Sequence, residues 1–136
     1  SASEYQLRGW ASTGGLVVVR RLVRPAADRP QMEVFVLEAG GARRVANIAG
    51  AYAVTARLSS AGSSLLYTGS DGGVHNVYEL PLAGGTPRRI TSNELPGRMF
   101  SGIEPLHDGS LVYTINERRQ DIWLSRVTQR QEPMDE

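Results

Sequence analysis

The chain has 136 residues, 40% of them hydrophobic and 21% charged, which is typical of one globular domain with its own core. Its 15 basic and 14 acidic residues leave a formal net charge of +1, which gives no support for a nucleic-acid-binding face. Because the chain has no cysteine, a disulfide scaffold, a zinc ribbon and a cysteine nucleophile are excluded. The best apolar run, Leu16 to Val19, is far shorter than a membrane span, so we expect no membrane insertion by this chain.

Three glycine turns recur along the chain at a constant spacing. Gly15 precedes a short apolar segment, Gly62 lies 47 residues after it, and Gly109 lies 47 residues after Gly62. Each of the later two glycines also leads into an apolar segment rich in leucine, valine and tyrosine. Short β-branched or aromatic runs bounded by glycine predict strands joined by turns.

Two further landmarks follow these glycine turns in the same order. A second apolar segment carries an aromatic residue, at Phe35, Tyr78 and Trp123. A Gly-Gly turn followed by an Arg-Arg pair then occurs twice, at 40–44 and 84–89. A period in the forties is typical of the four-stranded blade of a β-propeller.

We therefore predict an all-β fold made of β-propeller-type blades, each a four-stranded antiparallel sheet, with almost no helix. The first repeat has an insertion from Arg20 to Gln31 whose two prolines predict a loop or a hairpin extension. The last repeat shows no Gly-Gly turn and no clear fourth strand. The predicted propeller-like domain spans 1–127, with repeats at about 4–48, 52–91 and 100–127, and a flexible C-terminal tail at 128–136.

At these residues the chain resembles the TolB-like propeller repeat. In that family a Ser-Pro-Asp-Gly turn leads into an apolar strand, and a Gly-Gly turn later precedes Arg-Leu-Thr. Ser59–Gly62 and Leu106–Gly109 occupy the first of these positions in this sequence, and Gly84–Thr91 occupies the last. The middle repeat departs from the pattern at Ser60-Ala61, where the family has proline and aspartate. The resemblance implies the fold and a binding platform outside the cytoplasm, and it is hardly specific for one function.

The number of repeats raises the question of how the blades are covered. Closed propellers have four to eight blades, whereas this sequence encodes about three. An uncovered blade face is a large apolar patch, which soluble monomers rarely expose. The propeller is therefore expected to be partial, or to be completed by an oligomer or by a partner.

No group of residues in the sequence forms a recognisable catalytic motif. His75 and His107 lie in turns at non-equivalent repeat positions, so exposed turn residues are expected rather than metal ligands. The serines near Ser59 and Ser70 lack the Gly-x-Ser-x-Gly arrangement of a nucleophile elbow. We expect no catalytic residue, no metal and no cofactor.

Aspartates and tryptophans have simple structural interpretations. Asp71, Asp108 and Asp121 are expected to accept hydrogen bonds within their own turns, because their surroundings lack the ligand spacing of a calcium loop. Trp10 and Trp123 are expected to pack between blades rather than to form a ligand platform.

Arginines supply the candidate partner-binding residues. One group lies in the insertion of the first repeat, where propellers often carry binding specificity, and the others form Arg-Arg pairs that could attract an acidic partner. The alternative is that they are solvated edge residues that discourage aggregation. The candidates are Arg20, Arg21, Arg24, Arg29, Arg88, Arg89, Arg118 and Arg119.

Four functions remain open from the sequence. The first is a non-enzymatic protein–protein interaction or scaffold module of a bacterial envelope assembly, periplasmic or otherwise extracytoplasmic, whose open blades are closed by another protein or a second copy. The second is the propeller portion of a prolyl oligopeptidase-like serine peptidase without its catalytic domain. The others are the sensor domain of a membrane-bound regulator and an accessory subunit of a large membrane complex. The sequence itself does not choose a partner.

Overall fold

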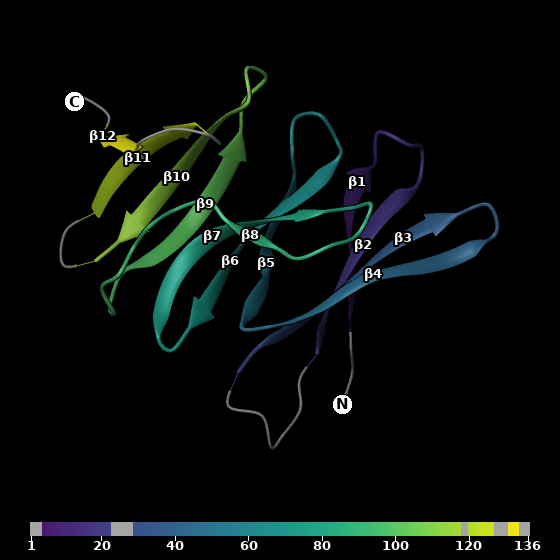
Figure 1. Cartoon of the computed structure of the whole chain (residues 1–136), viewed down its shortest axis with the longest axis horizontal. Helices are drawn as coiled ribbons and strands as arrows, with labels where there is room; N and C mark the ends of the chain where they lie inside the picture. Colours follow the sequence, from purple (N-terminus) through teal and green to yellow (C-terminus); the bar gives the residue numbers. More distant parts are fainter. Residues whose placement is uncertain (1–3, 23–28, 118–119, 127–130, 134–136) are drawn as a thin grey trace.

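The computed structural model describes residues 4–22, 29–117, 120–126 and 131–133, and it describes side chains up to residue 117. Within these ranges the chain forms twelve strands and no helix, which confirms the predicted all-β fold. The strands make three four-stranded antiparallel sheets, and each sheet follows the chain as a simple meander. Figure 1 shows the three sheets side by side, in chain order.

The sheets match the three predicted repeats. Sheet 1 contains β1 (Tyr5–Trp10), β2 (Leu16–Leu22), β3 (Gln31–Glu38) and β4 (Gly41–Ala49). Sheet 2 contains β5 (Ala51–Leu58), β6 (Ser64–Asp71), β7 (Val74–Pro81) and β8 (Arg88–Arg89). Sheet 3 contains β9 (Met99–Pro105), β10 (Ser110–Asn116), β11 (Gln120–Arg126) and β12 (Gln131–Pro133).

The structure corrects the prediction that the last repeat lacks a fourth strand. β12 pairs with β11 in antiparallel register, from Trp123↔Pro133 to Ser125↔Gln131. Part of the predicted tail is therefore an edge strand of sheet 3. Its three polar or proline residues carry no apolar alternation, so the sequence pattern could not reveal it.

The predicted insertion in the first repeat begins too early. Arg20 and Arg21 lie on β2, where Arg20 pairs with Glu33 and Arg21 with Met32 of β3. The strand continues past its apolar run because charged residues at these positions still have cross-strand partners. The insertion is shorter than predicted, since β2 ends at Leu22.

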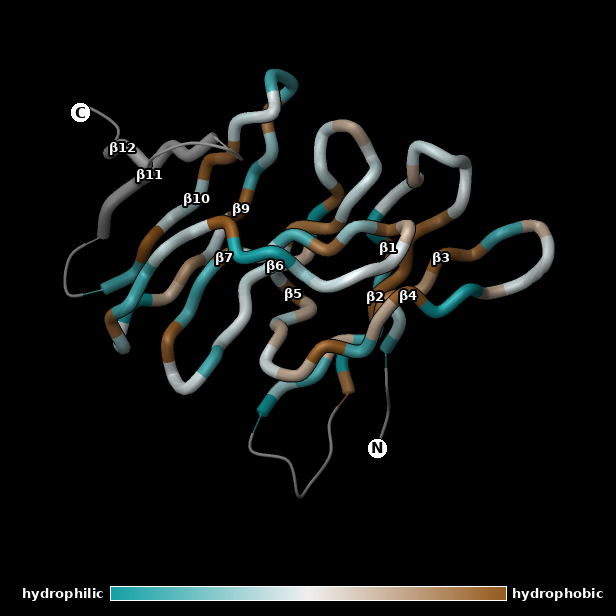
Figure 2. The backbone as a smooth tube through the Cα atoms, viewed as in Figure 1, coloured by the Kyte–Doolittle hydropathy of each residue, from teal (hydrophilic) through white to brown (hydrophobic). Residues whose placement is uncertain are grey.

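The first core lies between sheets 1 and 2. In β2, Val17 and Val19 face this core and are fully buried, because alternate strand residues share one face. Leu65 and Tyr67 of β6 meet them from sheet 2. Hydrophobic stretches fall mainly on the strands and polar stretches on the turns (Figure 2), which matches the predicted pattern.

A second, smaller core lies between sheets 2 and 3. Leu66 and Val77 of sheet 2 face Phe100, Leu111 and Tyr113 of sheet 3. Leu65 and Leu66 are neighbours on β6 and belong to different cores. Sheet 2 is therefore covered on both faces, whereas sheets 1 and 3 each contribute one face to these cores.

The outer strand of sheet 2, β8, is unusually short. After it, a buried network of side-chain hydrogen bonds attaches the chain to β7. β8 contains only Arg88 and Arg89, although the predicted repeat extends to Thr91. The Thr91 hydroxyl accepts a hydrogen bond from the Val77 amide at 2.9 Å and donates one to Asn76 Oδ1 at 2.7 Å. The Ile90 amide still donates to the Val77 carbonyl at 2.8 Å, and after Ile90 side chains instead of a backbone ladder fix the chain to β7.

Candidate functional site

The face of sheet 1 that points away from the first core carries a row of hydrophobic side chains. Tyr5 is 60% exposed and Leu7 is 62% exposed, and both lie on β1, which is the first strand of the sheet and one of its two edges. A groove of about 380 Å³ runs over this face. We call this surface the open face, and it is lined by Tyr5, Leu7, Val18, Phe35, Leu37 and Ala42.

A charged cluster borders the open face. Glu33 of β3 is buried, and it forms ion pairs with Arg20 of β2 and with Arg44 of β4, the latter at 3.3 Å. Arg20 also donates a hydrogen bond to the Tyr5 hydroxyl at 3.0 Å and lies over its ring, 5.2 Å from the ring centre. The hydrogen bond to Glu33 raises the pKa of Arg20. The cluster holds Tyr5 in place at one end of the face.

The candidate arginines do not form one continuous surface. Arg20 belongs to the charged cluster, and Arg21 is exposed on β2. Arg88 forms an ion pair with Glu79 at 2.7 Å, which is a partner within its own sheet. Arg24, Arg118 and Arg119 lie outside the described residues.

Arg29 and Arg89 come closer to one another than their sequence positions suggest. The Arg29 guanidinium reaches across to sheet 2 and donates a hydrogen bond to the Ser70 carbonyl at 3.1 Å. The charges of Arg89 and Arg29 both act on the Tyr78 phenol. The structure therefore brings these two candidates around a single tyrosine.

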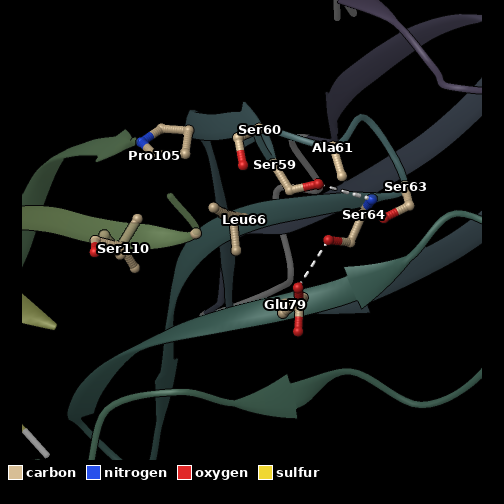
Figure 3. Close-up of a pocket in the computed structure, with 11 residues that line it drawn as sticks. Ser59, Ser60, Ala61, Ser63, Ser64, Leu66, Glu79, Pro105 and Ser110 are labelled. Carbon is tan, nitrogen blue, oxygen red and sulfur yellow. Dashed lines mark hydrogen bonds between the residues drawn. The ribbon is translucent and has the colours of Figure 1, made fainter. Parts of the chain in front are cut away.

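A serine-rich pocket lies between sheets 2 and 3, at the turns that join β5 to β6 and β9 to β10. Figure 3 shows Ser59 and Ser60 on one side and Glu79 across from them. The Ser64 hydroxyl donates to Glu79 at 2.8 Å, and the Ser59 hydroxyl accepts from the Ser64 amide at 3.2 Å. The volume of this pocket is about 160 Å³.

This pocket lacks the groups that would activate a serine. The residues lining it include five serines and one carboxylate, but none of the described lining residues is a histidine or a lysine. Glu79 is already paired with Arg88, and its other oxygen accepts from Ser64. A nucleophilic serine needs an adjacent base to accept its proton. The arrangement suits a structural role for the serines in their turns.

The histidines occupy different environments. His107 is exposed in its turn, as the sequence predicted. His75 is instead half-buried, and its ring stacks on Tyr52 at 5.6 Å with Nε2 3.0 Å from the phenol oxygen. Among the described residues, no three histidine, aspartate or glutamate side chains are placed to share a metal ion.

Two further predictions can be compared with the structure. Asp108 accepts a hydrogen bond from the Ser110 amide at 2.9 Å, which confirms its predicted role in its turn. Trp10 is 68% exposed, so the prediction that it packs between blades is wrong. It lies at the end of β1, directly before Ala11, which is buried in the first core. The side chains of Asp121 and Trp123 lie outside the described part of the chain.

The open face could not be identified from the sequence as a site. Its residues come from all four strands of sheet 1, and their shared side depends on strand register. The uninterrupted apolar runs of β2 and β3, Leu16–Val19 and Val34–Leu37, mark both faces of sheet 1 as hydrophobic. That two-sided pattern, together with the low number of repeats, is the sequence signal for an additional covering layer.

Comparison with known proteins gives matches in structure but not in sequence. No protein-family model matches the chain, and no curated protein matches it. A TolB-type protein from Agrobacterium tumefaciens matches with a TM-score of 0.68 and 13% identity, over 96% of this chain and 48% of that one. The β-propeller domain of the Trilobed protease from Pyrococcus furiosus, described as having an open velcro topology, matches with a TM-score of 0.64 and 11% identity, over 98% and 45%.

The chain thus spans about half the length of these two solved structures. Its three meander sheets correspond to blades, and the described residues form no helix long and apolar enough to cross a bilayer. The 47-residue repeat, the three four-stranded sheets and both structural matches show that this chain has a β-propeller fold of TolB-like type, built from three blades.

Proposed function

We propose that this chain is a non-enzymatic protein–protein interaction module whose open face binds a further propeller blade, supplied by a second copy of the chain. The observation that carries this proposal is the groove of about 380 Å³ lined by Tyr5, Leu7, Val18, Phe35, Leu37 and Ala42 on a face that no described segment covers. Blade faces of this kind are stable between neighbouring blades.

The two internal cores indicate what such a face binds. Sheet 1 covers sheet 2 on one side and sheet 3 covers it on the other, each with alternate residues of its strands. On β10, Val112 and Thr114 alternate with the residues that face the second core, so they lie on the outer side of sheet 3. We expect this outer side to meet the open face of another copy.

The length of the matched structures supports a second copy as the occupant. One chain spans about half of each matched chain, so two copies would supply about as many blades as one of them. Two identical contacts between the open face of one copy and the outer side of sheet 3 in the other would close a ring with twofold symmetry.

The mass in solution, measured by light scattering over a range of concentrations, tests this proposal. The chain should be a dimer that dissociates on dilution, and Leu7→Glu should weaken the dimer about 10-fold or more, since it places a charge in an apolar interface. Val54→Glu is the matched control, because Val54 is 74% exposed on β5 and lies outside the open face. A wild-type chain that stays monomeric at all concentrations would contradict the proposal.

The TolB-like fold supports the further proposal that the module works outside the cytoplasm, in a bacterial envelope assembly. Fractionation of cells that express the full-length gene product tests this location, and crosslinking in cells tests the assembly. The folded protein should be recovered in the periplasmic fraction. Recovery in the cytoplasmic fraction would contradict it.

A second candidate function follows from the match to the propeller domain of a protease. The chain would then be the propeller portion of a serine peptidase, with the reactive serine on another domain. Labelling the full-length gene product with a fluorophosphonate probe distinguishes the two functions. Covalent labelling outside residues 1–136 supports the peptidase, and the absence of labelling on a folded, full-length protein supports the interaction module.

A further inference from the structure

A second pocket lies between sheets 1 and 2. It adjoins the corner where β4 continues into β5, which can be followed in Figure 1. Its volume is about 250 Å³. It is at the opposite end of β6 from the serine-rich pocket of Figure 3. The pocket is lined by Arg29, Ile48, Ala49, Gly50, Ala51, Tyr67, Gly69, Ser70, Asp71, Tyr78 and Pro87.

Three side chains offer hydrogen-bond donors to this pocket. The Arg29 guanidinium donates to a neutral acceptor, the Ser70 carbonyl, and no described carboxylate lies within ion-pair distance of it. The rings of Tyr67 and Tyr78 are stacked 5.5 Å apart at an interplanar angle of 14°. Neither phenol forms a hydrogen bond to a residue that the structure describes, and both tyrosines line the pocket.

Both phenols keep their protons at neutral pH. Burial raises the pKa of Tyr67, and the charge of Tyr78 raises it further. Burial also raises the pKa of Tyr78, as does Asp71, whereas Arg89 and Arg29 lower it. A protonated phenol is a donor, so these hydroxyls can bind an acceptor such as an oxyanion.

The charges around Tyr78 are those of two arginines and one aspartate. Arg89 is exposed on the edge strand β8, without an ion-pair partner among the described residues. Asp71 is exposed at the end of β6 and makes no ion pair within the described chain. The net charge of these three side chains is therefore one positive charge, which favours an anion over a cation as the ligand.

A glycine at the corner makes the position of Arg29 possible. Gly50 has a φ of +83°, and a Cβ atom there would lie 2.4 Å from the Ser70 carbonyl oxygen and 2.7 Å from Arg29 Nη2. The Gly50 amide donates to the Pro30 carbonyl at 2.7 Å, and the Ser70 amide donates to the Gly50 carbonyl at 2.8 Å. These two hydrogen bonds connect the backbone next to Arg29, the β4–β5 corner at Gly50 and the end of β6.

We propose that this pocket binds a small oxyanion, a carboxylate or a phosphate group, between the Arg29 guanidinium and the hydroxyls of Tyr67 and Tyr78, with Arg89 opposite Tyr78 on β8. The planar guanidinium of arginine matches the oxygen pairs of both groups, and hydrogen bonds to a charged acceptor are the strong ones. Asp71 opposes binding, which makes the affinity adjustable through one exposed carboxylate. The proposal does not depend on the dimer.

The test is a titration of the ¹⁵N-labelled chain with sodium phosphate and, separately, with sodium acetate, at constant ionic strength balanced by chloride. Saturable shifts of the Gly50, Gly69 and Ser70 amides are expected. Arg29→Gln should weaken binding about 10-fold or more, because it removes charged hydrogen bonds. Asp71→Asn should tighten binding about 2- to 5-fold, because it removes a repulsive charge and keeps a residue suited to its turn.

Arg21→Gln is the matched control, since Arg21 is an exposed arginine on β2, outside the pocket, and it should bind as the wild type does. Saturation by phosphate alone identifies a phosphate group, saturation by acetate alone identifies a carboxylate, and saturation by both identifies a general oxyanion site.

Three results would overturn the proposal: no saturable shift with either anion, equal binding by Arg29→Gln in a variant that melts like the wild type, or weaker binding by Asp71→Asn. The Leu7→Glu variant should keep its anion affinity even if it is monomeric. Loss of the dimer with intact anion binding, or the reverse, therefore separates a failure of the proposed function from a failure of this one.

Discussion

Asn76 shows how a single side chain can replace part of a strand. It is 2% exposed, and its Oδ1 accepts hydrogen bonds from the Thr91 hydroxyl at 2.7 Å and the Asn93 amide at 2.8 Å. Its Nδ2 donates to the Asn93 carbonyl at 3.1 Å. A side-chain amide has both donors and acceptors. Asn76 can therefore bind the chain after β8 through its side chain, where strand pairing between β7 and β8 has ended.

Asn76→Ala should therefore lower the free energy of unfolding by about 3 kcal/mol, because it leaves a buried amide and a buried hydroxyl without their partner. Asn47→Ala is the matched control, since Asn47 is exposed on β4 and should change stability by less than about 0.5 kcal/mol. Urea unfolding followed by circular dichroism measures both variants. Equal stability of the two would show that the network contributes nothing.

At the same scale, the sequence offered arginines as candidates but did not reveal what they contact. Arg20 is paired with Glu33 because the two face each other across β2 and β3, and that register is visible only in the folded sheet. Arg89 lies opposite Tyr78 across β7 and β8, and Arg29 lines the same pocket as Tyr78, although the two arginines are far apart in the sequence. A repeat pattern places residues on strands, and it leaves side-chain partners undetermined.

At the scale of elements, the glycine turns and apolar runs predicted most strands correctly, because both signals are local. Strand residues alternate between two faces, and Leu65 and Leu66 show that both faces of a middle blade are hydrophobic. The failures were at strand ends. β12 has no apolar residue, and β8 is short because Thr91 and Asn93 bond through side chains.

The connection between sheets 1 and 2 depends on Gly50 in particular. Gly50→Ala should lower the free energy of unfolding by about 2 kcal/mol or more, since its φ is +83° and its Cβ would lie 2.4 Å from the Ser70 carbonyl oxygen. Gly40→Ala is the control, because a Cβ at Gly40 meets nothing within 4 Å and its φ is not in the left-handed region. Thermal melts that show equal losses for both variants would contradict this role of the corner.

At the scale of the whole molecule, stability is distributed over two cores that share only sheet 2. The first core contains Val17, Met32 and Tyr67, and the second contains Val77 and Phe100. Sheets of this kind contact only their neighbours, so their stability is a sum of local interfaces. A substitution in one core should therefore destabilise the two sheets that form that core more than it destabilises the third sheet.

Phe100→Ala and Met32→Ala test this arrangement, because Phe100 is 4% exposed in the second core and Met32 is fully buried in the first. Each truncation leaves a cavity and should lower stability by about 2 to 5 kcal/mol. Phe100→Ala should speed amide hydrogen exchange most in β9 and β10, with β2 and β3 still protected, and Met32→Ala should give the reverse pattern, as measured by mass spectrometry of peptides. If either variant speeds exchange equally in all three sheets, the blades unfold as one cooperative unit, and the open face of sheet 1 is then coupled to the second core through sheet 2.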